Sequence, residues 1–170
     1  MSDGIFQIPA QLTKIQSMSN GTTEMETKKG VRIKIDEDDV QELQKYNWYI
    51  GSHGYAMASV EGKHRLMHRV ILSAPPHLQV DHINGNRLDN RKNNLRLCTQ
   101  QENKYNSKNR WDSTTGLRGV MWDKRRKKYL VQVRASKKIV YSKRFSDIKE
   151  AVTARNEVVK KYHGEFARLV

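Results

Sequence analysis

The strongest constraint on the fold lies in residues 79–103, which read QVDHINGNRLDNRKNNLRLCTQQEN. Two short apolar runs enclose a loop that is rich in asparagine and carries neither a helical nor a strand period. Thr99 and Glu102 then give the Thr-x-x-Glu signature of a capped helix start. This stretch therefore predicts a strand, a long loop, a second strand and a helix that begins near Gln100.

Asp81 and His82 stand side by side in the first of these strands. A histidine can act as a general base near neutral pH because its ordinary pKa is about 6.5. Carboxylate and amide oxygens suit Mg²⁺, and packing the helix on the strands would bring Asn103 near Asp81. The pattern fits metal-assisted phosphodiester hydrolysis. The alternative that stays open is an asparagine-rich turn segment with no chemistry.

Lysine and arginine outnumber aspartate and glutamate by 32 to 18, so the formal net charge is +14. Residues 111–170 hold most of this excess, with 16 basic against 6 acidic side chains. Such an excess points to a polyanionic partner, most often nucleic acid. A basic protein of the ribosomal kind is the open alternative.

The chain has a single cysteine, Cys98, which excludes an internal disulfide and a cysteine zinc cluster. No apolar run approaches the roughly 18–20 residues that span a bilayer. The first residues also lack the basic-then-apolar pattern of a secretory signal. We therefore expect a cytoplasmic protein that has no membrane partner.

The chain is long enough for one ordinary domain or two small ones. Residues 1–30 are polar and weakly patterned, which is typical of a loosely held arm. Residues 31–110 form the first predicted domain, and its core is expected at about 79–109. Residues 111–115 read as a hinge before a second, basic domain over residues 116–168.

Residues 116–168 contain three strand-like runs with hairpin-length connections, followed by a helix. In the middle run, YLVQVR, alternation places a tyrosine and two valines on one face and Gln132 and Arg134 on the other. The helix is the only candidate to cover the apolar face. The opposite face is then available to enter the major groove of DNA.

Gln132 and Arg134 suit bidentate contacts with adenine and guanine edges. The predicted DNA-binding residues are Arg118, Lys124, Gln132, Arg134, Tyr141 and Lys143. The alternative for this domain is a generic basic fold that binds RNA or a protein.

The stretch VDHINGNRLDNRKNNLRLCTQQEN resembles the HNH nuclease motif of phage-borne and intron-associated homing endonucleases. The resemblance implies a ββα-metal fold in which His82 is the general base and Asn94 ties the loop backbone together. It further implies that Asp81 and Asn103 hold one Mg²⁺ or Mn²⁺ per active site. The implied reaction leaves 5′-phosphate and 3′-hydroxyl ends, and with one cysteine no structural zinc is expected.

His68 and Arg69 match an upstream His-Arg pair that is usual in this subgroup. The resemblance implies that they support the site or orient a phosphate. A purely structural histidine at position 68 is an equal alternative.

The basic domain is similar to the DNA-binding domain of plant ethylene-response factors, on the landmarks RGV, QVR, VYSKRF and HGEFA. That resemblance implies three antiparallel strands packed on one helix. The usual Trp-Gly-x-Trp is not intact here, so the resemblance speaks for the fold more than for base specificity.

Together these features predict an α+β protein with an HNH nuclease domain followed by a small sheet-plus-helix domain. The predicted function is a metal-dependent DNA endonuclease that acts on double-stranded DNA without a small-molecule cofactor. A monomer is favoured and a dimer stays open, and the expected place is the cytoplasm, that of a host cell if the protein is encoded by a phage. The alternatives are a non-catalytic DNA-binding regulator with a degenerate nuclease fold and an RNA-binding protein.

Overall fold

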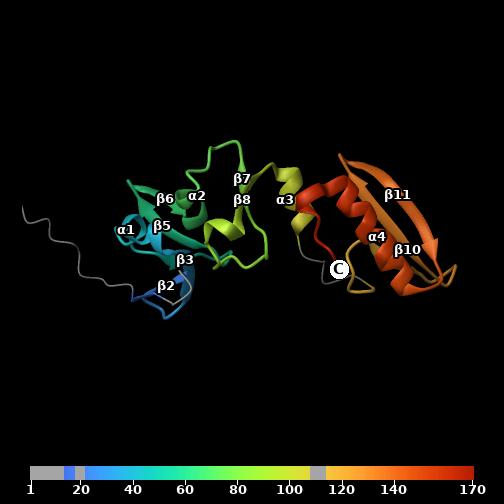
Figure 1. Ribbon diagram of the computed structural model, residues 1–170, viewed down its shortest axis with the longest axis horizontal. Coiled ribbons are helices and arrows are strands. Elements are labelled where there is room, and N and C mark those ends of the chain that lie inside the picture. Colours follow the sequence, from blue (N-terminus) through green and yellow to red (C-terminus); the bar gives the residue numbers. More distant parts are fainter. Residues whose placement is uncertain (1–13, 18–21, 108–113) are drawn as a thin grey trace, which may run out of the picture. The chain divides into compact units, whose positions relative to one another are not determined.

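A computed structural model describes residues 14–17, 22–107 and 114–170 (Figure 1). The chain divides into two compact units, the first ending at Leu97 and the second beginning at Cys98. The fold is a mixed α/β fold of small sheets and few helices, which agrees with the predicted class. No helix among these residues is long and apolar enough to cross a membrane.

The first unit holds three small sheets, in the orders β1-β2-β3, β4-β5-β6 and β7-β8. Its elements are β1 (Ile15–Ser17), β2 (Thr22–Glu26), β3 (Arg32–Asp36), η1 (Glu37–Asp39), α1 (Val40–Leu43), β4 (Tyr49–Ile50), β5 (Ala56–Val60), β6 (Lys63–Leu66), α2 (Met67–Ile71), β7 (Gln79–His82), η2 (Lys92–Asn94) and β8 (Leu95–Cys98).

The prediction that residues 1–30 form a loose arm is wrong for residues 22–26. They form β2, which pairs antiparallel with β3 and places Met25 opposite Ile33. Both side chains are fully buried in the hydrophobic core of this unit. The two threonines at the start of β2 hid the strand, because their polarity masks a period of two. Residues 1–13 and 18–21 lie outside the described residues.

Replacing Met25 with alanine is expected to lower the free energy of unfolding of the first unit by about 2–5 kcal/mol, because the change leaves a cavity in its core. Urea unfolding followed through the backbone amide signals of Ile33 and Ile35 measures this loss. The exposed Met121, changed to alanine in the same way, is the control and should shift stability by no more than about 0.5 kcal/mol. A Met25 variant as stable as the parent would contradict the place of β2 in the core.

The long loop between β7 and β8 is fastened to β3. The backbone N–H of Lys34 donates to the carbonyl of Leu88 at 2.8 Å, and the N–H of Asn90 donates to the carbonyl of Lys34 at 2.8 Å. The loop thereby adds a short parallel bridge, Lys34 to Asp89, along the edge of the β1-β2-β3 sheet. The sheet thus fixes where the loop between Asp81 and Asn94 runs.

The second unit pairs three antiparallel strands in the order β11-β10-β9 and covers one face of them with the longest helix (Figure 1). Its elements are α3 (Gln100–Asn106), β9 (Val120–Asp123), β10 (Lys128–Ala135), β11 (Lys138–Phe145), α4 (Ile148–His163) and η3 (Gly164–Phe166). Val131 and Val133 of β10 pack with Ala151 and Val159 of α4, as the alternation predicts. Asp147 caps α4 by accepting two backbone N–H bonds.

The helix α3 begins at Gln100 with a complete capping box formed by Thr99 and Glu102, which confirms the predicted start. The compact division, however, places α3 with the second unit, whereas the predicted first domain ran to residue 110. The contacts of Tyr105 give one reason: its ring stacks on His163 with centroids 3.8 Å apart. Of the predicted hinge, residues 111–113 lie outside the described residues.

Candidate functional site

Asp81 and His82 occupy the end of β7, and each is only 5% exposed. The Asp81 carboxylate is paired with Arg96 on β8: Oδ2 accepts from Nε at 2.9 Å and from Nη2 at 2.7 Å. An arginine fork held on one carboxylate oxygen is a strong, charge-assisted contact. The two strands of this small sheet are therefore joined by an ion pair as well as by their backbones.

The ring of His82 lies in a cluster of rings that come from separate parts of the first unit. Its centroid is 5.0 Å from the ring of His68 on α2 and 5.9 Å from the ring of Tyr55. Tyr55 in turn lies 5.3 Å from His68 and carries the guanidinium of Arg87 over its face at 4.7 Å. The cluster surrounds one side of His82 with apolar ring surface.

These surroundings favour neutral rings. Burial lowers the pKa of His82 below its ordinary value, and the hydrogen bond to Asn90 and the charge of Asp81 partly oppose this effect. Burial, with smaller contributions from His82 and Arg69, lowers the pKa of His68 to about 3. At neutral pH both rings are therefore uncharged, and His82 can accept a proton.

Asn90 is a polar neighbour of His82 that sequence reasoning missed. It is 1% exposed, and its Oδ1 lies 3.3 Å from Nε2 of His82. Its Nδ2 donates to the carbonyl of Arg87 at 3.5 Å. The sequence offered no local sign of this contact, because Asn90 is one of several asparagines in a turn-rich loop and its position depends on β3.

Asn94 ties the loop together in the way that the motif implies. Its Oδ1 accepts the backbone N–H of Asn84 at 3.0 Å, and its Nδ2 donates to the carbonyl of Asp89 at 2.7 Å and to Oδ1 of Asn84 at 3.1 Å. One buried amide thus spans ten residues of loop. It fixes the chain immediately after His82 against the chain before β8.

Asp89 is a second buried anchor that the sequence did not single out. It is 3% exposed, and its carboxylate receives Nε of Arg91 at 2.8 Å, Nη2 of Arg91 at 2.7 Å and Nδ2 of Asn84 at 2.9 Å. These contacts, with the Arg91 hydrogen bond the largest, hold the pKa of Asp89 below its ordinary value. The loop therefore has an ionic centre.

The two residues predicted to support the site, His68 and Arg69, have different contacts. The ring of His68 packs edge to face against the ring of His82. Arg69 instead donates to the carbonyls of Leu78, Ala74 and Pro75 at 2.8–3.0 Å. It closes the proline turn that leads into β7, which is a structural role.

Asp81 and Asn103 are the side chains predicted to hold a divalent cation. Asp81 offers a carboxylate and Asn103 an amide oxygen, both of which suit a hard cation that keeps several waters. Arg96 places a competing positive charge on Asp81. Among residues 14–17, 22–107 and 114–170, no group of three histidine, cysteine, aspartate or glutamate side chains could hold a metal ion. Asn103 lies in the second unit, on α3.

The predicted DNA-binding residues of the second unit do not form one surface. Gln132 and Arg134 lie on the face of β10 opposite α4, because they alternate with the buried Val131 and Val133. On β11, Lys143 pairs with Val131 and Tyr141 with Val133, so both lie on the other face, where α4 packs.

The prediction that Tyr141 and Lys143 flank Gln132 and Arg134 is therefore wrong. Strand register decides the face, and a shift of one residue reverses it. The residues of β11 that share the open face, defined here as the face of β10 opposite α4, are Ile139, opposite Arg134, Ser142, opposite Gln132, and Arg144, opposite Leu130.

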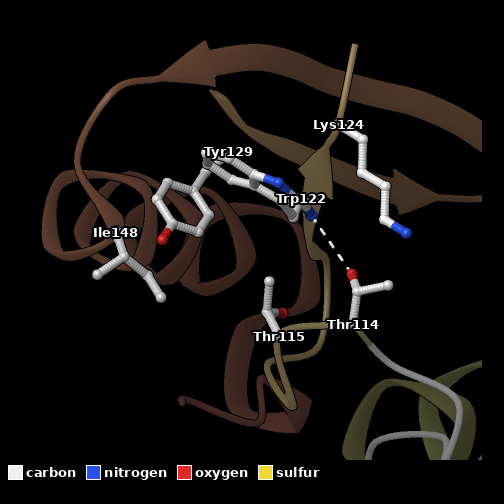
Figure 2. A pocket seen from close by; sticks show the side chains of 6 residues that line it. All are labelled: Thr114, Thr115, Trp122, Lys124, Tyr129 and Ile148. Atoms are coloured by element: carbon white, nitrogen blue, oxygen red, sulfur yellow. Dashed lines mark hydrogen bonds between the residues drawn. The ribbon is translucent and has the colours of Figure 1, made fainter. Parts of the chain in front are cut away.

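Lys124 follows β9 and lines a shallow pocket (Figure 2). The pocket is lined by Thr114, Thr115, Trp122, Lys124, Tyr129 and Ile148. The rings of Trp122 and Tyr129 lie 4.7 Å apart, and the Thr114 hydroxyl accepts the backbone N–H of Trp122 at 3.4 Å. Lys124 thus lines the same pocket as these two aromatic rings.

Arg118 holds α3 in the second unit. Its guanidinium donates to the carbonyls of Lys104 at 2.6 Å and Tyr105 at 3.3 Å, and to both the carbonyl and the hydroxyl of Ser107. Arg168 donates to the next carbonyl, that of Asn106, at 3.2 Å. The last carbonyls of a helix have no partner within it, and here two arginines donate to them, together with Ser107, whose hydroxyl donates to the carbonyl of Lys104.

Replacing Arg118 with alanine is expected to lower the free energy of unfolding of the second unit by about 1–3 kcal/mol, because the carbonyls at the end of α3 lose the hydrogen bonds that the guanidinium donates. Thermal and urea unfolding measure this loss. Arg134 is the matched control: its side chain is exposed, and its alanine variant should stay within about 0.5 kcal/mol of the parent. Equal stability of both variants would contradict the role given to Arg118.

The amino-acid sequence of this chain is similar to those of known viral and phage proteins. The sequence model of the HNH endonuclease family matches residues 62–105. An uncharacterized HNH endonuclease of Acanthamoeba polyphaga mimivirus is 37% identical over 83 residues, which are 46% of this chain and 44% of that protein. Protein 3.8 of Escherichia phage T7 is 36% identical over 94 residues, which are 55% of this chain and 77% of that protein. No solved structure matches the chain significantly.

The matched segment contains β7, the asparagine-rich loop and β8, and with them Asp81, His82 and Asn94. The part of the chain that matches the HNH family therefore includes the residues whose geometry around His82 and Asn94 is described above. The chain belongs to the same family as Protein 3.8 of phage T7 and carries an HNH endonuclease domain.

Proposed function

We propose that the chain is a metal-dependent DNA endonuclease of the homing type, which hydrolyses phosphodiester bonds at preferred sites. The observation that carries this proposal is His82, a buried and uncharged histidine at the end of a strand inside the HNH segment. A neutral imidazole can take a proton from water at physiological pH. Its ring is packed against His68 and Tyr55, which limits its motion.

In the proposed reaction, His82 accepts a proton from the attacking water while the water oxygen bonds to phosphorus. The bond from phosphorus to the 3′ oxygen breaks, and that oxygen takes a proton from solvent. The products are a 5′-phosphate and a 3′-hydroxyl. Asn94 contributes by holding the loop that follows His82 in a fixed shape.

Asp81 and Asn103 are the residues that would hold one Mg²⁺ or Mn²⁺, and no structural zinc is proposed. A bound ion would stabilise the negative charge that develops on the phosphate and the leaving oxygen. The partner proposed for the second unit is double-stranded DNA, read by Gln132 and Arg134 on the open face. The strongly basic composition of residues 111–170 supports an anionic partner. The proposed active form is a monomer.

The proposal is tested with supercoiled plasmid incubated with the protein in Mg²⁺, in Mn²⁺ and in chelator. We expect nicked or linear DNA with either metal and none in chelator. The nicks should be closed by a DNA ligase, which requires a 5′-phosphate beside a 3′-hydroxyl. Intact plasmid under every divalent ion would refute the nuclease, and cutting in chelator would refute the metal dependence.

The second candidate is a DNA-binding regulator with an inactive nuclease fold. The ion pair between Asp81 and Arg96 favours it, because the guanidinium neutralises the carboxylate that a metal would need. This candidate predicts a gel shift on duplex DNA without any cutting. It also predicts that the Arg96→Ala variant does not cleave DNA in Mg²⁺. If the protein is instead a nuclease that Arg96 restrains, this variant should reach its full cleavage rate at a lower Mg²⁺ concentration than the parent.

A further inference from the structure

We propose that the shallow pocket of the second unit binds the base of an unpaired DNA nucleotide, with Trp122 as the stacking surface and Lys124 as the contact for the phosphate (Figure 2). The pocket holds about 450 Å³, which lies within the roughly 300–1,000 Å³ that is usual for small-ligand sites. The inference concerns binding alone, so it does not depend on whether the chain cuts DNA.

Strand register places this pocket on the helix side of the sheet. Trp122 on β9 lies directly opposite Tyr129 on β10, and Tyr129 packs with the core beneath α4. Ile148, the first residue of α4, lines the pocket as well. The pocket is therefore separate from the open face, where Gln132 and Arg134 are proposed to read duplex DNA.

The aromatic wall of the pocket has room for a third ring. The centroids of Trp122 and Tyr129 are 4.7 Å apart and their planes are tilted by 59°, so the two rings meet at an angle and neither covers the other. Trp122 remains 36% exposed. A cross-strand aromatic pair stabilises a hairpin, and this explains their mutual contact. The exposed ring surface beside a lysine is the kind of platform on which nucleic-acid bases stack.

The charges at the rim select an anionic ligand. Residues 124–128 read KRRKK, and all five side chains are exposed. The adjacent Asp123 carboxylate accepts from Arg126 and from Arg144 on β11, at 3.3 and 3.0 Å. Within the part of the chain that the structure describes, Lys124 forms no ion pair. The positive charge beside the pocket is therefore available to a phosphate.

The pocket fits the face of a base better than its edge. Within a duplex each base is stacked on its neighbours, and the grooves present only base edges. The Thr114 hydroxyl accepts the backbone N–H of Trp122, and the Thr115 hydroxyl donates to the carbonyl of Val120 at 2.6 Å. Both hydroxyls thus serve the backbone, and the ring of Trp122 is left as the main contact. We therefore expect a site for unpaired bases that has little preference among them.

Fluorine NMR tests the site directly. The full chain, labelled with 5-fluorotryptophan and kept in chelator, contains three tryptophans, and the signal that is lost in Trp122→Phe identifies Trp122. An oligothymidylate of about ten nucleotides should shift this signal, and a blunt duplex of the same length should not. If neither DNA shifts the signal, or if both shift it equally, the inference is wrong.

Affinity measurements then separate stacking from structure. Trp122→Leu keeps an apolar side chain but removes the ring, and it should weaken oligothymidylate binding about 5- to 100-fold at constant salt. Trp122→Phe should retain most of the affinity. Tyr162 is the matched control, because it is an exposed aromatic residue on α4, and Tyr162→Leu should bind as the parent does. Unchanged binding by Trp122→Leu would reduce Trp122 to a structural role.

A pair of lysine variants tests the phosphate contact. Lys124→Gln should weaken oligothymidylate binding more than Lys160→Gln, which removes the same charge from an exposed position on α4. Equal losses would remove Lys124 from the site, and tighter binding of oligouridylate would overturn the choice of DNA. A protein that cuts no plasmid but binds oligothymidylate through Trp122 would refute the proposed function and support this site. A protein that cuts plasmid while its Trp122 signal ignores the oligonucleotide would do the reverse.

Discussion

Replacing His82 with alanine is expected to slow plasmid cleavage by about 10²- to 10⁴-fold, the usual contribution of a general base. The ring is buried, uncharged at neutral pH and packed against His68 and Tyr55, so the variant loses the proposed proton acceptor. The measurement is single-turnover conversion of supercoiled plasmid in Mg²⁺, with enzyme in excess over DNA. His82→Gln, which fills more of the space, should be equally slow.

Two controls separate chemistry from damage. His77 is exposed, and its alanine variant should cut at the parent rate. Gel shifts in chelator should show that the His82 variants bind DNA as the parent does, because the proposed reading surface is on the second unit. If His82→Ala cuts as fast as the parent, His82 is not the base. If it loses DNA binding together with cleavage, the division between cutting and reading is wrong.

Features that depend on neighbours in the sequence could be predicted. The capping box at Thr99 fixed the start of α3 because its two hydrogen bonds join residues three apart. The two faces of β10 followed from a period of two, and the loop between β7 and β8 followed from turn residues without a period. The role of Asn94 as the loop's internal tie came from the resemblance, and its bonds to Asn84 and Asp89 agree with it.

Features that depend on distant pairing could not be predicted. Strand β2 is recognisable only through β3, which supplies the partner for Met25. The face on which Tyr141 lies depends on the register of β11, and no residue count fixes that register in advance.

The roles of residues in and near the candidate site also depend on contacts between distant parts of the chain. Asn90 reads as one turn residue among several until β3 places it beside His82. The basic charge of Arg118 suggested DNA, whereas its contacts are the carbonyls at the end of α3. Charge and residue type thus identified candidates, and tertiary contacts decided their roles.

Asp89→Ala is expected to lower the free energy of unfolding of the first unit by about 2–4 kcal/mol at neutral pH, and cleavage should fall with it. The change removes a buried carboxylate and leaves the donors of Arg91 and Asn84 without their partner. Breaking one side of a buried ion pair is costly because the remaining charge stays poorly solvated. Urea unfolding followed through amide signals of the first unit measures the loss. The exposed Asp38, changed to alanine, should have almost no effect.

The same carboxylate makes a prediction about pH. The hydrogen bond from Arg91 is the largest cause that holds the folded-state pKa of Asp89 below its ordinary value of about 4. Its contribution to stability is therefore fully present above that ordinary pKa and is lost as the pH falls through the lower, folded-state pKa. The stability difference between the parent and Asp89→Asn should be constant from neutral pH to about pH 5 and should shrink below pH 4. A difference that stays constant into strong acid would mean that the charge of Asp89 does not stabilise the loop, and that its hydrogen-bonding shape alone does.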